Sequence, residues 1–128
     1  MKILLDTHIL LWALGDSPLL TEQARSFIAD EANECFFSPV SLAEIAIKHQ
    51  KHPAQMALSA GEIRAALITS GYRELPYTAR HAAAMDNLPP HHADPFDRML
   101  VAQALSEDVK FMSHDDKVVK YGDLVIPV

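Results

Sequence analysis

The chain has 128 residues, of which 49% are hydrophobic and 22% charged. This length suits one domain around a single core, so we expect residues 1–128 to form a single domain. The formal net charge of −6 excludes a protein that holds nucleic acid mainly by neutralising phosphates with lysine and arginine. It does not exclude a nuclease that approaches phosphates through metal ions.

Neither a membrane span nor a signal peptide is expected. The apolar run at the N-terminus is interrupted by Asp6, and no stretch reaches the roughly 18 to 20 apolar residues of a membrane helix. The single cysteine, Cys35, cannot form an internal disulfide and lies in an apolar run, which indicates a buried, reduced thiol. These features predict a cytoplasmic protein.

The first half of the chain alternates strand and helix patterns. Ile3 to Leu5 form an apolar run typical of a buried strand, and the run ends at Asp6. Ser38 followed by Pro39 is typical of a helix start. The expected elements are, in order, a strand over 3–5, a helix over 8–14, a helix over 21–30, a strand over 34–37 and a helix from Ser38 to about Lys51.

The second half continues the alternation. Ser59 and Glu62 match the capping box of a helix that ends at Gly71, and Asp94 with Pro95 repeats the cap and proline signal. The expected elements are a weak strand over 72–75, a helix after Thr78, a loop over 87–93, a helix over 94–104, a strand over 109–113, a turn or short helix over 115–120 and a strand over 124–126. This alternation predicts an α/β fold with a parallel sheet covered on both faces.

Four acidic residues are expected at one edge of this sheet. Ligands of open parallel sheets bind beyond the carboxyl ends of the strands. Asp6 ends the first strand, and Asp115 follows the strand over 109–113. Glu44 lies in the second turn of its helix, and Asp97 lies in the first turn after Asp94. We therefore predict that the four carboxylates converge.

Carboxylates that converge need a compensating cation. Like charges repel, and each would otherwise have a raised pKa. Carboxylate oxygens suit Mg²⁺ or Mn²⁺, which can activate a water and stabilise charge on a phosphodiester. The predicted chemistry is metal-dependent phosphodiester hydrolysis, in which the activated water leaves 5′-phosphate and 3′-hydroxyl ends.

Four segments also resemble a known family. They are Asp6–Trp12, Ser41–Lys48, Asp94–Ala104 and Ser113–Asp115. In this order they resemble the PIN-domain ribonucleases and, more closely, the VapC toxins of bacterial toxin–antitoxin pairs. The resemblance implies a three-layer α/β/α sandwich with a central, mostly parallel sheet. It also implies an endoribonuclease that cleaves RNA with Mg²⁺ or Mn²⁺, a homodimer, and inhibition by a cognate VapB-type antitoxin.

The resemblance also assigns residues by position. The catalytic acids it implies are Asp6, Glu44, Asp97 and Asp115, of which Asp6 and Asp97 are the direct metal ligands. Asp116 is an alternative fourth acid, and we favour Asp115 because it lies closer to the strand end. Asp94 is interpreted as a helix N-cap rather than a ligand.

Simpler roles remain open for several of these residues. Asp6 could merely cap the helix after it, although Thr7 would cap that helix equally well. Glu44 could be a surface acid paired with Lys48 one turn away. Thr7 and Ser113 could hydrogen-bond the carboxylates or serve only as caps.

Neighbouring aromatic and basic residues have two interpretations as well. Trp12 is interpreted as a core or dimer contact before an RNA-stacking platform. A basic group could contact phosphate or form an ordinary solvated face; its members are Lys48, His49, Lys51, His52 and Arg98. His91 and His92 are interpreted as a solvated loop rather than a zinc site, because the i, i+4 spacing of zinc-binding histidines is absent.

Two other functions compete with the nuclease. One is a phosphatase in which Asp6 is a covalent nucleophile; such enzymes need a second acid two residues later, where this chain has His8. The other is a non-catalytic PIN-like module that only binds protein.

Overall fold

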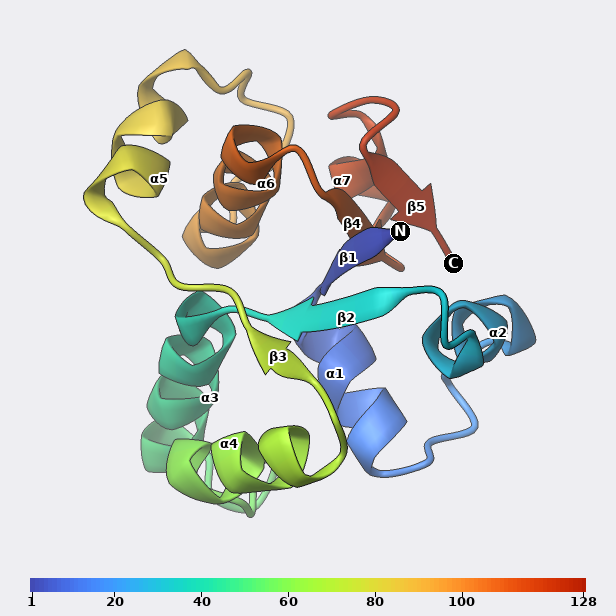
Figure 1. The fold of residues 1–128 in the computed structure, drawn as a ribbon. Coiled ribbons are helices and arrows are strands. Elements are labelled where there is room, and N and C mark those ends of the chain that lie inside the picture. The colour runs from blue at the N-terminus through green and yellow to red at the C-terminus, as the bar shows by residue number, and fades with distance from the viewer.

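A computed structural model describes all residues, 1–128. Five parallel strands form one sheet in the order β3-β2-β1-β4-β5 (Figure 1). The strands are β1 (Lys2–Leu5), β2 (Glu34–Phe37), β3 (Arg73–Glu74), β4 (Lys110–Ser113) and β5 (Val125–Pro127). The helices are α1 (Thr7–Leu14), α2 (Glu22–Ala29), α3 (Pro39–Lys51), α4 (Ala60–Thr69), α5 (Ala79–Ala83), the 3₁₀ turn η1 (Ala84–Asn87), α6 (Pro95–Glu107) and α7 (Asp116–Val119).

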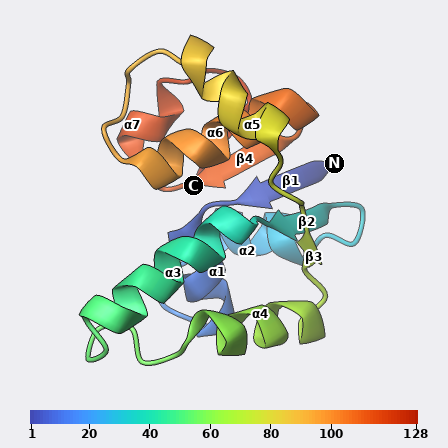
Figure 2. The same ribbon diagram turned by 90° about the vertical axis from the view of Figure 1, so that its left-hand side faces the viewer.

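The helices form a layer on each face of the sheet (Figure 2). Successive side chains of a strand point to opposite faces, so Ile3 and Leu5 of β1 enter one core with residues of α1, α2 and α4. Leu4 enters a second core with residues of α6 and α7. The predicted three-layer α/β/α sandwich is confirmed, and its sheet is parallel throughout.

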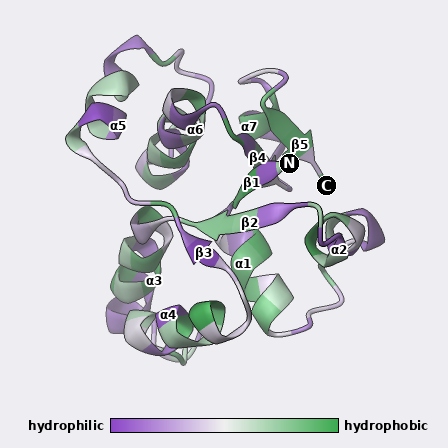
Figure 3. Cartoon of the chain, viewed as in Figure 1, coloured by the Kyte–Doolittle hydropathy of each residue, from purple (hydrophilic) through white to green (hydrophobic).

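The elements differ in hydropathy (Figure 3). Helix α1 is coloured hydrophobic over most of its length, and the short edge strand β3 is hydrophilic. Cys35 on β2 is half-buried rather than buried as predicted; it packs against the core next to exposed Glu34 at the start of the strand. No helix combines the length and the apolar character that crossing a membrane requires.

Helix boundaries differ from the predictions at two points. Helix α1 begins at Thr7, one residue earlier than predicted, because Asp6 is its N-cap. Helix α6 continues to Glu107, beyond the predicted end at residue 104, and stops at Asp108 in the left-handed conformation with φ 53°.

The strand register brings the carboxyl ends of β1 and β4 together. Leu5 pairs with Met112, and the Asp6 backbone N–H donates to the Met112 carbonyl at 3.0 Å. Asp6 and Ser113 therefore leave the sheet side by side. The chain runs outward from β1 to β2 on one side and to β4 on the other, so this edge is the switch point at which open α/β sheets bind ligands.

We predict that Leu4→Ala destabilises the protein by about 2–5 kcal/mol, because Leu4 is fully buried between its neighbours in the second core. The control Leu19→Ala removes a side chain that is 62% exposed and should change stability by less than about 0.5 kcal/mol. Urea unfolding followed by circular dichroism measures both values. Equal losses in the two variants would contradict the described core.

Candidate metal centre

Asp6 is held rigidly at the end of β1. Its Oδ1 accepts from the Thr7 backbone N–H at 2.6 Å, and its Oδ2 accepts from the Ser113 hydroxyl at 2.7 Å. The side chain is buried, and burial raises the pKa of Asp6 although both hydrogen bonds act in the opposite direction. Asp6 therefore caps α1 and also points into the switch point, so the two interpretations of this residue are compatible.

The two hydroxyl residues differ in their contacts. Ser113 holds Asp6, as one of the two interpretations expected. Thr7 instead donates its hydroxyl to Ser41 Oγ at 2.9 Å, and it lies inside α1 rather than at its cap. Thr7 therefore orients Asp6 through its backbone, not through its side chain.

Asp97 reaches the same edge from the first turn of α6. Asp94 is the N-cap of this helix, as predicted, and its Oδ1 accepts from the backbone N–H groups of Phe96 at 2.9 Å and Asp97 at 3.5 Å. Burial, followed by the charges of Asp6 and Asp94, raises the pKa of Asp97 from 3.8 to about 8. A metal-free Asp97 thus resists ionisation at neutral pH.

Glu44 adds a third buried acid from the second turn of α3. The residue is 6% exposed, and its Oε2 lies 3.0 Å from Lys48 Nζ. Its Oε1 is buried and has no hydrogen-bond partner, which is costly for a carboxylate oxygen. The charge of Glu44 also raises the pKa of both Asp6 and Asp97. Glu44 is therefore both paired with Lys48 and part of the acidic cluster.

The structure brings Asp115, not Asp116, to this cluster. Asp115 caps α7 by accepting from the Lys117 backbone N–H at 2.8 Å. Its pKa is lowered: burial acts to raise it, but the hydrogen bonds from His92 and Lys117 outweigh that effect. Asp116 is exposed in the first turn of α7.

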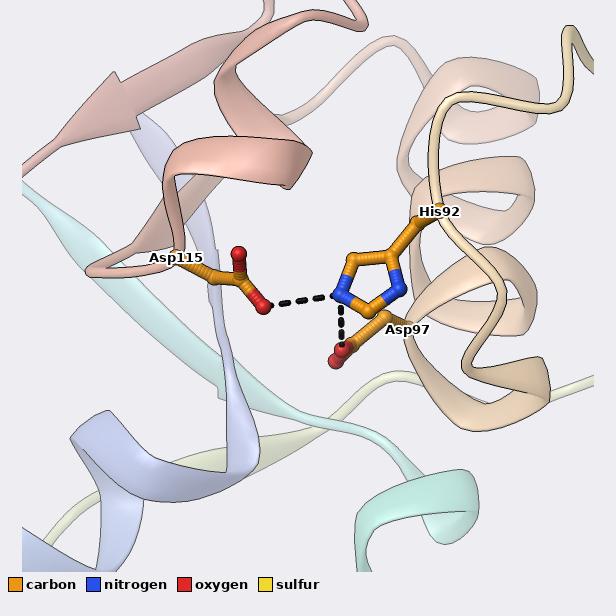
Figure 4. Close-up of side chains that lie close together, drawn as sticks. All are labelled: His92, Asp97 and Asp115. Carbon is orange, nitrogen blue, oxygen red and sulfur yellow. Dashed lines mark hydrogen bonds and ion pairs between the residues drawn. The ribbon is translucent and has the colours of Figure 1, made fainter.

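His92 lies between two of the acids (Figure 4). Its Nε2 is 2.7 Å from Asp115 Oδ2 and 3.1 Å from Asp97 Oδ2, and one ligand atom from each of the three residues lies within 4.8 Å of the others. The prediction of a solvated histidine loop is correct for exposed His91 but wrong for His92, whose side chain is 9% exposed. The Asp94 backbone N–H, which donates to His92 Nδ1 at 3.0 Å, turns the ring inward.

Two hollows flank the acidic cluster. A hollow of about 230 Å³ is lined by Asp6, His8, Trp12, His114 and Asp115. The polar residues that line a second hollow, of about 470 Å³, are His8, Glu44, Lys48, Asp94 and Asp97. His8 borders both hollows.

Trp12 agrees with its interpretation as a core contact, whereas most of the basic group lies outside both hollows. Half-buried Trp12 packs on the core but also lines the smaller hollow, where its ring lies 5.9 Å from that of His8. Lys48 is the one member of the basic group that lines either hollow. Arg98 instead donates to the Pro89 carbonyl at 3.2 Å. The roles of His8 and His92 were missed because neither one histidine in a first helical turn nor two adjacent histidines in a loop give a periodic signal.

The residues present fit a hard divalent cation. An unpaired Glu44 oxygen and the raised pKa values of Asp6 and Asp97 all indicate missing positive charge. Carboxylate oxygens are the donors that Mg²⁺ and Mn²⁺ prefer.

Comparison with solved structures shows which proteins share this fold. The structure of VapBC2 from Rickettsia felis bound to a promoter DNA fragment is 16% identical in sequence to this chain, with a TM-score of 0.69. The alignment covers 100% of this chain and 98% of that one. FitAcB from Neisseria gonorrhoeae is 17% identical with a TM-score of 0.66, covering 98% and 96%. VapBC-1 from nontypeable Haemophilus influenzae is 18% identical with a TM-score of 0.63, covering 94% and 92%.

The sequence was compared with curated proteins and with models of protein families. No curated protein matches it, but the family model of the PIN domain matches residues 3–124. The match runs from within β1 to just before β5 and includes all four acids of the cluster. The chain therefore belongs to the PIN-domain family.

Proposed function

We propose that this chain is a VapC-type toxin, a Mg²⁺- or Mn²⁺-dependent endoribonuclease of the cytoplasm. The observation that carries the proposal is the meeting of Asp6, Glu44, Asp97 and Asp115 at the switch point of a PIN-domain sheet. The similarity in fold to VapBC2 and VapBC-1 supports the toxin assignment.

The acids take different roles in this proposal. Asp6 and Asp97 would hold the ion, while Glu44 and Asp115 complete the site directly or through water. A bound Mg²⁺ or Mn²⁺ lowers the pKa of a water and neutralises charge on the phosphodiester. The hydrogen bonds from Ser113 and Thr7 keep Asp6 in one orientation before the ion arrives.

The two hollows provide a path for RNA past the acids. Trp12, half-buried in the smaller hollow, offers a ring on which a base can stack. Lys48 in the larger hollow offers a positive charge to a phosphate. His8 borders both hollows, and Asp6 lines the smaller one beside it.

We predict that the chain cleaves single-stranded RNA with Mg²⁺ or Mn²⁺ and that EDTA abolishes cleavage. Asp6→Asn and Asp97→Asn should each lower the rate about a hundredfold or more, because each removes a proposed ligand charge. Asp115→Asn should also lower it, whereas Asp116→Asn, which changes an exposed neighbour, should leave it unchanged. Gel analysis of an end-labelled RNA measures the rates.

The ends of the products separate the competing mechanisms. A water nucleophile leaves 5′-phosphate and 3′-hydroxyl ends, so 2′,3′-cyclic phosphate ends would reject the proposed mechanism. Cleavage that persists in EDTA or in Asp6→Asn would reject it as well. Absence of cleavage of every RNA tested would favour the non-catalytic binding module.

A second prediction concerns the stability of the metal-free protein. Because the pKa of Asp97 is raised from 3.8 to about 8, the stability that its protonated form contributes is complete below about pH 4 and is lost as pH rises through 8. In EDTA, Asp97→Asn should therefore raise the melting temperature at pH 8 by about 3 °C or more and by less at pH 5.

The matched control is Asp86→Asn, which removes an exposed carboxylate from η1. This variant should melt like the wild type at both pH values. Mn²⁺ at pH 8 should stabilise the wild type and Asp86→Asn but not Asp97→Asn. An equal response of all three proteins to Mn²⁺ would contradict the placement of Asp97 in a metal site.

We also propose a homodimer and a VapB-type antitoxin as the partners of this chain. An apolar hollow of about 370 Å³ lies between α1 and α4 and suits an apolar segment of the antitoxin. Its apolar lining includes Leu11, Leu14, Met56, Ala57, Leu58, Ile63 and Ala66.

Leu58→Glu should weaken antitoxin binding about tenfold or more, because it places a charge in this apolar hollow. Leu58 is 48% exposed, and the control Leu105→Glu changes a side chain on α6 that is 50% exposed. Copurification from coexpressing cells and titration of the purified antitoxin measure binding. RNA cleavage by Leu58→Glu alone should remain normal, and a loss of antitoxin binding by both variants would reject the assignment of this hollow.

A further inference from the structure

We propose that His92 limits this site to one divalent ion by placing an N–H donor where a second ion would bridge Asp97 and Asp115. The inference rests on the proposed function, because it concerns the same acids. It adds a residue that determines how many ions the acids hold.

The position of His92 is that of a bridging cation. Its Nε2 lies 2.7 Å from Asp115 Oδ2 and 3.1 Å from Asp97 Oδ2 (Figure 4). These two carboxylates come from different elements, the start of α6 and the cap of α7. The imidazole thus occupies the space in which an ion shared by both acids would lie.

Hydrogen bonding decides whether His92 is a donor or a ligand. The Asp94 backbone N–H donates to Nδ1 at 3.0 Å, so Nδ1 is the acceptor of this hydrogen bond and Nε2 is the ring nitrogen that bears hydrogen toward the two carboxylates. A histidine that binds a metal through one nitrogen normally donates from the other. His92 has the opposite arrangement, so its Nε2 presents hydrogen to the carboxylates and no free electron pair to a metal.

The loop around His92 is anchored, which keeps the ring in place. Leu88 is buried in the second core, and Arg98 donates to the Pro89 carbonyl at 3.2 Å. The backbone of Asp94 holds the ring itself. Moving the His92 ring out of the cluster would break its hydrogen bond with Asp94.

The other side of the cluster stays open to an ion. Glu44, which is 6% exposed, has an Oε1 without a partner and faces the hollow that Asp97 also lines. The charges of Asp6 and Glu44 both act on Asp97. One ion held among Asp6, Glu44 and Asp97 would compensate this charge without displacing His92.

Calorimetric titration of metal-free protein with Mn²⁺, in the absence of RNA, tests the proposal. Electron paramagnetic resonance of bound Mn²⁺ counts the ions independently. The wild type should bind about one ion per chain, and His92→Ala should gain a second, weaker binding event. His92→Gln restores an amide N–H near the Nε2 position and should again bind about one ion.

The control His91→Ala changes the exposed neighbouring histidine, which packs on Tyr121 at a ring distance of 5.0 Å, and should bind as the wild type does. Circular dichroism establishes that each variant is folded. Two ions in the wild type, one ion in His92→Ala, or loss of Mn²⁺ binding in His92→Ala would each overturn the proposal. The last result would make His92 a ligand.

These outcomes are separable from failure of the proposed function. If the ion counts follow the expectation but no RNA is cleaved, the nuclease proposal fails and the role of His92 stands. If RNA is cleaved with metal but His92→Ala still binds one ion, the proposal for His92 fails and the nuclease proposal stands. Absence of Mn²⁺ binding by the wild type overturns both.

Discussion

Repulsion among carboxylates at the end of β1 is the constraint on which this structure depends. Asp6, Glu44 and Asp97 are all buried there, and each charge raises the energy of the others. The protein offsets part of this cost with Lys48 beside Glu44 and with hydrogen bonds to Asp6. The remaining cost is visible in the pKa of Asp97, which burial and then the neighbouring acids raise, and in the unpaired oxygen of Glu44. A site that is costly when empty is well prepared to gain from binding a cation.

Geometry at this edge comes from backbone features more than from side-chain packing. The register of β1 with β4 sets Asp6 beside Ser113, and N-caps set the start of α1, α6 and α7. Each of these caps is an aspartate, so the residues that begin the helices also supply much of the negative charge. Forming the fold and concentrating the acids are therefore the same event in this chain.

Most of the fold could be predicted because its signals are local. Apolar runs, caps and prolines mark the elements, and the strand and helix alternation fixes their layering. The meeting of the four acids could be predicted from their positions at strand ends and in early helical turns. The resemblance to PIN-domain ribonucleases then agrees with the family match over residues 3–124.

The surroundings of the acids were harder to predict because they depend on three-dimensional contacts. The inward turn of His92 follows from one backbone hydrogen bond to its Nδ1, which no spacing rule describes. Trp12 packs on the core and also lines the smaller hollow. The sequence of an apolar helix does not distinguish between these two roles. Arg98 was interpreted as a possible phosphate contact, but it donates a hydrogen bond to the Pro89 carbonyl instead.

The hydrogen bond between Ser113 and Asp6 joins residues 107 positions apart in the chain. An N-terminal fragment that ends before β4 lacks this contact, and it also lacks both Asp115 and its cap. During synthesis, the acids from the first strand and from α3 must wait for the last part of the chain before the cluster is complete. The acidic cluster is therefore complete only after β4 and the start of α7 have joined β1.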